Sequence, residues 1–398
     1  MTNELLAQVA KEYGSPAFLF DLEALKKRMK AVKEIVGEKI SLCYSIKANP
    51  FLIHPMLECV DKLEVCSPGE LSICKSLNVP ASTIIYSGVN KGEKDIAEAM
   101  DYEVYIYTAE SLHQLELLQE EAAKTDSIRP VLLRLNANSQ FGMSKEDLIY
   151  AIEHCYMYPN IEIKGIHYFV GTQRKKLNDQ AEELEMLEKL MDDLKESHDF
   201  VVQKLEYGPG LPVPYFVKDD FSDTLSPIRE IAPILQRVAE KVELTIEMGR
   251  FYTAECGYYF SSVEDLKRSN DGTNYAILDG GMNHLSYLGQ TMGLKVPKIA
   301  LVSKSKTNCL NETDVEKREY CLCGSICSTN DVMVRRVELE KLELGDVLVF
   351  QNTGAYSVTE GIYLFLSRTM PRILLHENGG KIQMVRDFVE SYNFNLSK

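Results

Sequence analysis

Residues 41–67 read SLCYSIKANPFLIHPMLECVDKLEVCS, which is an apolar run, a segment with apolar residues three and four apart, and a second apolar run. Short apolar runs predict strands, and the wider spacing predicts an amphipathic helix. The same alternation continues in both directions, from about residue 17 to about residue 250. Roughly eight such units in one stretch favour a closed parallel (β/α)8 barrel of the TIM type over an open nucleotide-binding sheet.

The pattern changes after Arg250. Residues 252–370 contain short apolar runs such as NYAILDGG, DVLVFQNTGAY and GIYLFLS, with few helical stretches between them. These runs predict antiparallel strands of a second, β-rich domain with a barrel or sandwich form. We therefore expect a barrel over residues 20–258 and a β-rich domain made of residues 1–19 and 259–398.

Composition narrows the class of protein. The chain has 398 residues, and its 44 Lys and Arg against 59 Asp and Glu give a net charge of −15. This charge disfavours binding to nucleic acid or to an anionic membrane, and no apolar stretch approaches the ~18 residues of a membrane span. The N-terminal segment lacks the order of a secretory signal, so we expect a soluble, cytoplasmic protein.

The ten cysteines are expected to be thiols, because cytoplasmic redox buffers keep cysteines reduced. Cys321, Cys323 and Cys327 form a C-x-C-x3-C motif, but no second Cys or His pair lies nearby at the spacing of a zinc site. The sequence therefore predicts no metal.

Three strand ends carry residues that suit chemistry, and in such a barrel the C-terminal strand ends face the active site. Lys47 closes an apolar strand; it is either a surface lysine or an amine that forms a Schiff base with an aldehyde. Glu247 and Arg250 are either a local ion pair or partners for a ring nitrogen and a phosphate. Gly208 and Gly210 form either a simple turn or an anion-binding turn. Together these groups are what pyridoxal phosphate requires.

Ten short motifs carry a resemblance over nearly the whole chain. They are, in order, YSIKANP, EVCSPGEL, SGVNKGEKDI, QFGM, GIHYFVGTQ, YGPG, EMGR, LDGGMNHL, CGSICSTND and GAYS. In this order they resemble the fold-type III pyridoxal-phosphate decarboxylases, the group that contains diaminopimelate and ornithine decarboxylases. The resemblance implies decarboxylation of an amino acid to an amine.

The resemblance also implies roles for single residues. Lys47 would be the Schiff-base lysine and Glu247 the partner of the pyridinium nitrogen. Cys327 would be the catalytic cysteine, donated across the interface of a head-to-tail homodimer to protonate the carbanion. The phosphate would be held by Thr172, Gly210, Arg250 and Tyr356, with Gly208 in the same turn. The structural alternatives are a buried thiol at Cys327, a core aromatic at Tyr356 and a strand residue at Thr172.

The chain departs from the family pattern near the cofactor and near the distal end of the substrate. Phe169 stands where a His normally stacks on the cofactor ring, and Pro209 replaces the middle Gly of a triple-glycine turn. Diaminopimelate decarboxylases place an Arg-Pro after Gly-Met-Asn, whereas residues 283–288 read NHLSYL with Tyr287 in that stretch. Ser328 replaces the acid that follows the catalytic cysteine.

These departures argue against diaminopimelate, because its distal charges would lack partners. Asp279 and Asp331 remain candidate partners for an amine, although Asp279 is equally suited to capping a turn. QFGM and GIHYFVGTQ resemble a branch that decarboxylates modified or carrier-tethered amino acids in antibiotic and siderophore pathways. Diaminopimelate decarboxylase, a racemase of the same barrel class and a noncatalytic regulator are the alternatives; a racemase needs a second Tyr base where CGSICSTND offers a Cys.

Overall fold

The computed structural model describes residues 1–287, 293–304 and 316–397, and the chain divides into two compact units. The barrel unit comprises residues 26–213 and 222–252. The sheet unit comprises residues 1–25, 214–221 and 253–398.

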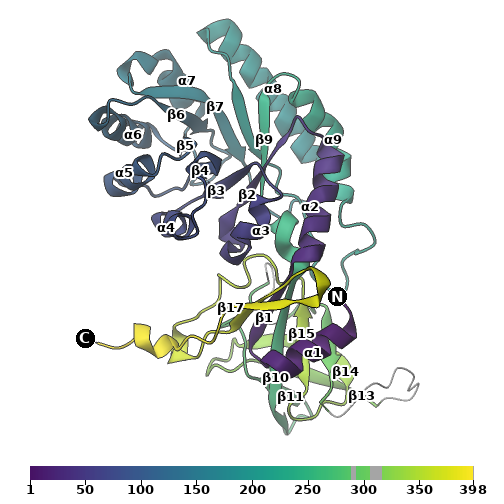
Figure 1. Cartoon of the computed structure of the whole chain (residues 1–398). Coiled ribbons are helices and arrows are strands. Elements are labelled where there is room, and N and C mark those ends of the chain that lie inside the picture. The colour runs from purple at the N-terminus through teal and green to yellow at the C-terminus, as the bar shows by residue number, and fades with distance from the viewer. Residues whose placement is uncertain (288–292, 305–315, 398) are drawn as a thin grey trace. The chain divides into compact units, whose positions relative to one another are not determined.

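The barrel unit is built on eight parallel strands (Figure 1). They are β2 (Ser41–Ser45), β3 (Lys62–Val65), β4 (Ile84–Tyr86), β5 (Ile106–Ala109), β6 (Arg129–Arg134), β7 (Ile161–Phe169), β8 (Lys204–Gly208) and β9 (Glu243–Met248). The last strand pairs with the first, in a register that sets Ser41 opposite Thr245, so the barrel is closed. The prediction of a TIM-type barrel is confirmed.

Helices follow the strands, and several begin at a capping serine. The helices are α2 (Leu22–Val36), α3 (Ile53–Leu57), α4 (Pro68–Ser76), α5 (Glu93–Asp101), α6 (Leu112–Lys124), α7 (Lys145–Glu153), α8 (Leu177–His198), α9 (Ser226–Val238) and α10 (Arg250–Thr253). Ser67, Ser111 and Ser144 each accept a hydrogen bond from the backbone N–H three residues later, which fixes where α4, α6 and α7 begin.

The sheet unit contains a nine-stranded mixed sheet. Its strands are β1 (Ala17–Asp21), β10 (Gly257–Arg268), β11 (Asn274–Leu278), β12 (Ile299–Val302), β13 (Lys317–Cys323), β14 (Val332–Glu340), β15 (Val347–Gln351), β16 (Arg372–His376) and β17 (Ile382–Arg386). Most neighbours are antiparallel, as predicted, but β1 pairs with β16 and β11 with β13 in parallel. The prediction missed these pairs because they join strands far apart in sequence.

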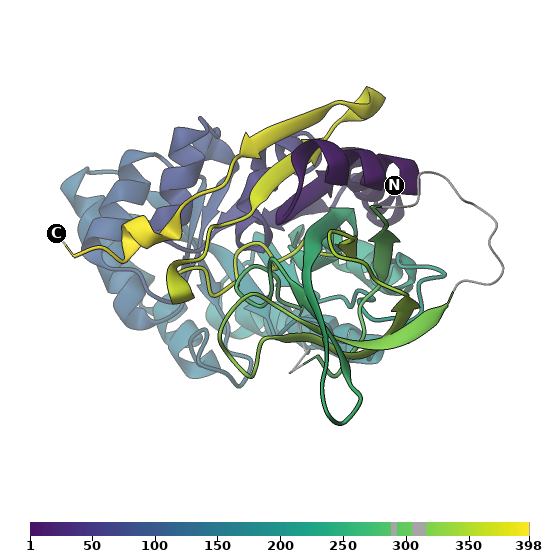
Figure 2. The same ribbon diagram turned by 90° about the horizontal axis from the view of Figure 1, so that it is seen from below.

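Helix α1 (Asn3–Tyr13) covers part of this sheet, beside β16 in Figure 2. Leu6 and Val9 pack in one apolar cluster with Leu19, Phe260 and Leu374. The N-terminal segment is therefore part of the core of the sheet unit, because the apolar face of α1 is buried against these sheet residues.

The divisions between the units differ in detail from the expected ranges. Residues 214–221 leave the barrel sequence and join the sheet unit, where Val217 N–H donates to Val296 O at 2.9 Å. Nothing in the apolar pattern of this short segment distinguishes it from the surrounding barrel sequence.

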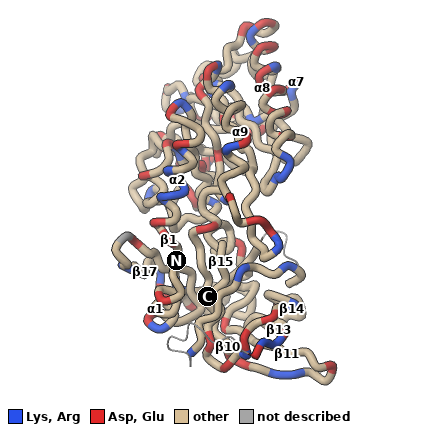
Figure 3. Tube along the Cα trace, turned by 90° about the vertical axis from the view of Figure 1, so that its right-hand side faces the viewer, with Lys and Arg blue, Asp and Glu red and all other residues tan. Residues whose placement is uncertain are grey.

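Charge is mixed along the helices of the barrel unit, and both signs occur on α8 and α9 (Figure 3). Among the described residues, no helix combines the length and apolar character needed to span a bilayer.

Candidate active site

Lys47 lies at the C-terminal end of β2, in a short 3-10 helix over Ile46–Ala48. The strand stops there because Asn49 turns the chain and Pro50 offers no N–H to continue a ladder. The Nζ atom of Lys47 is 2.6 Å from Oε2 of Glu64 and 3.6 Å from Oε1 of Glu247. The lysine side chain is 38% exposed, whereas both carboxylates are almost fully buried. The amine is therefore partly accessible to solvent and lies above two buried carboxylates.

Glu247 ends β9 and is held from two sides. Ser45 Oγ donates to Oε1 at 2.5 Å, and His167 Nε2 lies 3.2 Å from Oε2. Burial opposes ionisation, but the charge of Lys47 and the hydrogen bond with His167 outweigh it and hold the pKa of Glu247 well below its usual range. Glu247 is therefore a fixed negative charge at the barrel mouth.

Glu64 behaves differently, although it lies in the same cluster. Burial and the neighbouring charge of Glu247 raise the pKa of Glu64 to about 7, against the attraction of Lys47. Two carboxyls so close to one another do not ionise equally well, and the second one keeps its proton to a higher pH. Glu64 can thus gain or lose a proton near neutral pH, at 2.6 Å from Lys47 Nζ.

Two further buried groups in this cluster have unpartnered atoms within the described residues. Neither carboxyl oxygen of Glu206 has a hydrogen-bond partner, and burial raises its pKa well above the usual value. His167 Nδ1 is also without a partner, and burial lowers the pKa of that imidazole. A neutral His167 donates from Nε2 to Glu247, which leaves Nδ1 as an acceptor.

A tight glycine turn follows β8. Gly210 has φ +60°, and a Cβ there would lie 1.8 Å from Gly171 O. A Cβ on Gly208 would lie 2.4 Å from the Phe169 ring, so that ring rests against bare backbone. This turn therefore accepts only glycine at both positions.

Beside the turn, Arg250 Nε donates to Thr172 Oγ1 at 3.3 Å. Gly210 O accepts from Arg174 N–H at 3.0 Å, which joins the two loops. Backbone N–H groups of a glycine turn, a hydroxyl and a guanidinium form the donor set that a phosphate monoester needs.

These residues fit pyridoxal phosphate. The cluster supplies a primary amine at the barrel mouth in Lys47, a permanent carboxylate in Glu247 and a phosphate-sized set of donors around Gly210. The side chain of Phe169 adds an apolar face beside the turn. All the predicted cofactor residues except Tyr356 thus belong to the barrel unit, namely Lys47, Phe169, Thr172, Gly208, Gly210, Glu247 and Arg250.

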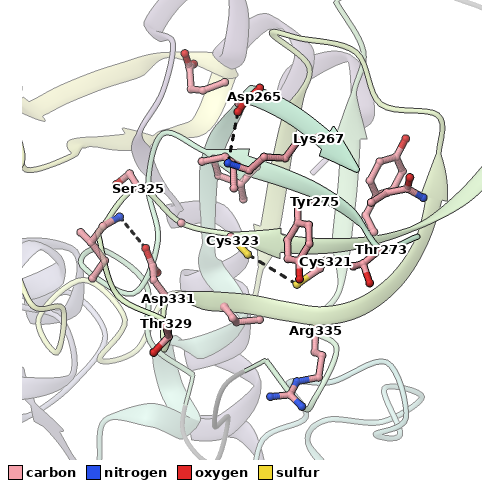
Figure 4. Close-up of a pocket in the computed structure, with 18 of the residues that line it drawn as sticks. Asp265, Lys267, Thr273, Tyr275, Cys321, Cys323, Ser325, Thr329, Asp331 and Arg335 are labelled. Carbon is pink, nitrogen blue, oxygen red and sulfur yellow. Dashed lines mark hydrogen bonds and ion pairs between the residues drawn. The ribbon is translucent and has the colours of Figure 1, made fainter. Parts of the chain in front are cut away.

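The remaining predicted residues lie in the sheet unit. Cys327, Ser328, Asp331 and Asp279 line one cavity of about 1170 Å³, part of which is shown in Figure 4. Cys327 is exposed, whereas Asp331 is buried and accepts backbone N–H bonds from Met282 and Ile326 at 2.8 and 2.9 Å. Asp331 thus holds the loop that carries Cys327.

Asp279 is similarly engaged. Its Oδ1 accepts from Ser261 Oγ and Ser262 N–H, and its Oδ2 accepts from Ser15 Oγ at 2.5 Å. Both candidate carboxylates for a substrate amine are therefore already hydrogen-bonded within the sheet unit.

The two tyrosines occupy different settings. Tyr287 is buried, donates to Gln351 O at 2.6 Å and packs edge-on against Tyr215. Tyr356 follows β15 and has φ +64°, a conformation that is uncommon for a residue with a Cβ. A loop around Tyr356 is fixed by Thr359 and Glu360 N–H groups, which donate to its carbonyl.

The sequence analysis did not single out Ser45, Glu64, His167 and Glu206. Each lies at or near a C-terminal strand end, so the rule that found Lys47 and Glu247 would also have found them if every polar strand-end residue had been considered. Lys91 was quoted only within a motif. It is buried after β4, donates to Gly88 O at 2.5 Å, and burial lowers its pKa to about 8.

Comparison with known proteins agrees with this chemistry. Residues 22–254 match the family described as pyridoxal-dependent decarboxylase, pyridoxal binding domain. Diaminopimelate decarboxylase of Aquifex aeolicus is 25% identical over 98% of this chain and 92% of its own length. A Staphylococcus aureus protein named 2-[(L-alanin-3-ylcarbamoyl)methyl]-2-hydroxybutanedioate decarboxylase is 26% identical, over 90% of this chain and 93% of its own.

A third relative, the L-glutamyl-[BtrI acyl-carrier protein] decarboxylase of Niallia circulans, is 24% identical over 94% of this chain and 91% of its own. Among solved structures, an Aquifex aeolicus protein superposes with a TM-score of 0.85 at 26% identity, covering 98% of this chain and 92% of that one. The family match spans more than half of the chain and includes every barrel residue of the cluster. The chain therefore belongs to the pyridoxal-dependent decarboxylase family, and its cofactor is pyridoxal phosphate.

Proposed function

We propose that this amino-acid decarboxylase acts on a modified or carrier-tethered amino acid and not on diaminopimelate. The observation that carries the proposal is that residues 283–287, which follow Gly-Met, contain no Arg or Lys to bind a distal carboxylate. His284 is bonded to Thr369 O and Tyr259 Oη, and Tyr287 is bonded to Gln351 O. The side chains of His284 and Tyr287 are thus hydrogen-bonded within the sheet unit, whereas Asn283 Nδ2 has no partner among the described residues.

Energetics support the same conclusion. Diaminopimelate carries an ammonium and a carboxylate at its distal end, and leaving a buried charge without its partner costs about 3–5 kcal/mol. Ser328 offers only a hydroxyl, whose oxygen accepts from Asn330 N–H at 3.2 Å. A substrate with an amide or thioester at its distal end avoids this cost because it presents no such pair of charges.

The names of two relatives point in the same direction. The Staphylococcus aureus enzyme is named for an alanine joined through a carbamoyl group to a hydroxybutanedioate, and the Niallia circulans enzyme for a glutamyl group on a carrier protein. Both are amino acids conjugated to a larger group. Because several other relatives are named diaminopimelate decarboxylases, that activity is the second candidate.

Within this proposal the residues of the barrel unit take the following roles. Lys47 binds the cofactor's aldehyde, and Glu247 keeps the ring nitrogen protonated. When bound there, the cofactor would supply the electron sink that decarboxylation needs. Thr172, Gly208, Gly210 and Arg250 hold the phosphate, and Phe169 lies against the ring.

The sheet unit supplies the remaining roles. Tyr356 completes the phosphate site, and Cys327 delivers a proton to the product carbon. Asp331 positions the Cys327 loop through its two backbone hydrogen bonds. We further propose a homodimer in which Cys327 of each subunit enters the active site of the other subunit. We also propose that the protein acts in the cytoplasm.

The test is carbon dioxide release from the cofactor-loaded protein. The panel includes meso-diaminopimelate, L- and D-lysine, L- and D-ornithine, arginine, glutamate, conjugates of 2,3-diaminopropionate and a carrier-bound glutamyl group. Lys47→Ala, which lacks the amine, is the blank for every compound. Release confined to the conjugated substrates is expected. Faster release from diaminopimelate would overturn the proposal, and cofactor binding without release from any compound would favour a noncatalytic regulator.

A further inference from the structure

Two cysteines of β13 form a close thiol pair in the sheet unit. Cys321 and Cys323 lie two positions apart on one strand, so their side chains leave the same face of the sheet. Their sulfur atoms are 3.8 Å apart and face one another in Figure 4. Both line the cavity of about 1170 Å³ that Cys327 also lines.

The sulfur separation matches a shared metal ion. A thiolate binds Zn²⁺ at about 2.3 Å, and two ligands at the tetrahedral angle are then about 3.8 Å apart. We propose that Cys321 and Cys323 form a bidentate site for a soft divalent cation of the zinc and cadmium type. This site differs from the closed four-ligand zinc site that the sequence argues against, because two coordination positions stay open to water or to a small thiol.

Local structure keeps the two sulfurs together. The β13–β14 ladder is irregular between Tyr320, Leu322 and Cys323, so the strand is distorted at the pair. Cys321 is buried and Cys323 is half-buried, so water has only limited access to the two thiols.

Disulfide formation is the competing chemistry for such a pair. It would remove two protons and two electrons, for example by exchange with an oxidised low-molecular-weight disulfide. In a regular strand, with a rise of about 3.3 Å per residue, the Cα atoms of Cys321 and Cys323 would be roughly 6.6 Å apart. This separation is near the upper end of the Cα–Cα range of disulfides. The sulfurs would also have to approach from 3.8 Å to about 2.05 Å. Metal binding needs neither movement.

The cavity itself admits a cation. Its lining includes the carboxylates Glu264 and Glu319 as well as the cationic side chains of Arg335 and Arg336. Asp265 and Lys267 form an ion pair at 3.7 Å, which leaves that part of the wall nearly neutral. A cation held here would lie in the same cavity as Cys327.

The experiment is a Cd²⁺ titration of the reduced, cofactor-loaded full chain, followed by the ultraviolet absorbance of cadmium thiolate. Wild type and the control Cys155→Ser, an exposed thiol of the barrel unit, should show one saturable site. Cys321→Ser and Cys323→Ser should each weaken binding by more than about tenfold, since even outer-sphere changes cost about that much. Cadmium binding that persists unchanged in both variants would overturn the proposal.

A second measurement does not depend on the folding of variants. X-ray absorption of the wild-type protein loaded with one Zn²⁺ should show two sulfur neighbours at about 2.3 Å and lighter atoms in the other positions. A shell without sulfur would contradict the site. Ready loss of two hydrogens to oxidised glutathione, without metal binding, would identify the pair as a redox couple and overturn the metal proposal.

Discussion

The turn after β8 gives a sharp test of the phosphate site through the substitution Gly210→Ala. Alanine at φ +60° costs about 1–2 kcal/mol because its Cβ approaches the following carbonyl. The same Cβ would lie 1.8 Å from Gly171 O, so the backbone must shift, at a further cost of about 1–3 kcal/mol. The total is about 2–5 kcal/mol. If the turn relaxes in the apoprotein and must return to its present form to bind phosphate, the lower limit corresponds to about 30-fold in binding.

Gly171→Ala is the matched control, because a Cβ there meets no atom within 4 Å. We expect this control to bind pyridoxal phosphate within about twofold of wild type, whereas Gly210→Ala loses at least about 30-fold. The assay is cofactor titration of the apoprotein by absorbance, with thermal unfolding of each apoprotein measured alongside. Equal affinities for the two variants, or wild-type affinity in Gly210→Ala, would refute the assignment of this turn to the phosphate.

Three further predictions concern single side chains. Glu247→Gln should retain bound cofactor but lose most of kcat, because the ring nitrogen loses its fixed negative partner; an unchanged kcat would contradict that role. Cys327→Ala should also retain cofactor, and product analysis should show slowed or diverted amine formation, whereas loss of cofactor would instead indicate a structural role. The pKa of Glu64 rises from 4.5 to about 7 on folding, so the folded apoprotein holds a proton that the unfolded chain has lost. The free energy of unfolding that this proton contributes therefore falls as the pH rises from 4.5 to about 7. Chemical denaturation of Glu64→Gln should not show this fall. Identical pH profiles for wild type and the variant would disprove the raised pKa of Glu64.

The barrel was predictable because its signal is periodic. Strand runs such as SLCYS and LEVCS repeat with helical segments between them, and each strand end is marked by a polar residue such as Lys47. Lys47, Glu247 and Arg250 were found because their chemical types are unusual at strand ends. The mixed sheet was only partly predictable, because the pairing of β1 with β16 depends on contacts across the whole chain.

The electrostatics of the site could not be obtained from the sequence. Glu64 and Glu247 have the same side chain, yet one pKa is raised and the other lowered. Burial and the charge of Glu247 prevail at Glu64, whereas at Glu247 burial is outweighed by the charge of Lys47 and the hydrogen bond with His167. The engagement of Asp279 and Asp331 by backbone and serine groups was equally hidden, since it depends on how loops from separate strands meet. Such partners are fixed by three-dimensional packing and have no local pattern.

Borohydride reduction of the loaded protein tests whether the amine at the end of β2 carries the cofactor. Reduction makes the lysine–cofactor linkage permanent, and proteolysis with mass spectrometry then locates it. We expect a phosphopyridoxyl group on Lys47 and none in the Lys47→Ala variant. The group on Lys91, a buried lysine whose pKa is lowered by burial, or on no lysine at all, would show that Lys47 does not carry the cofactor.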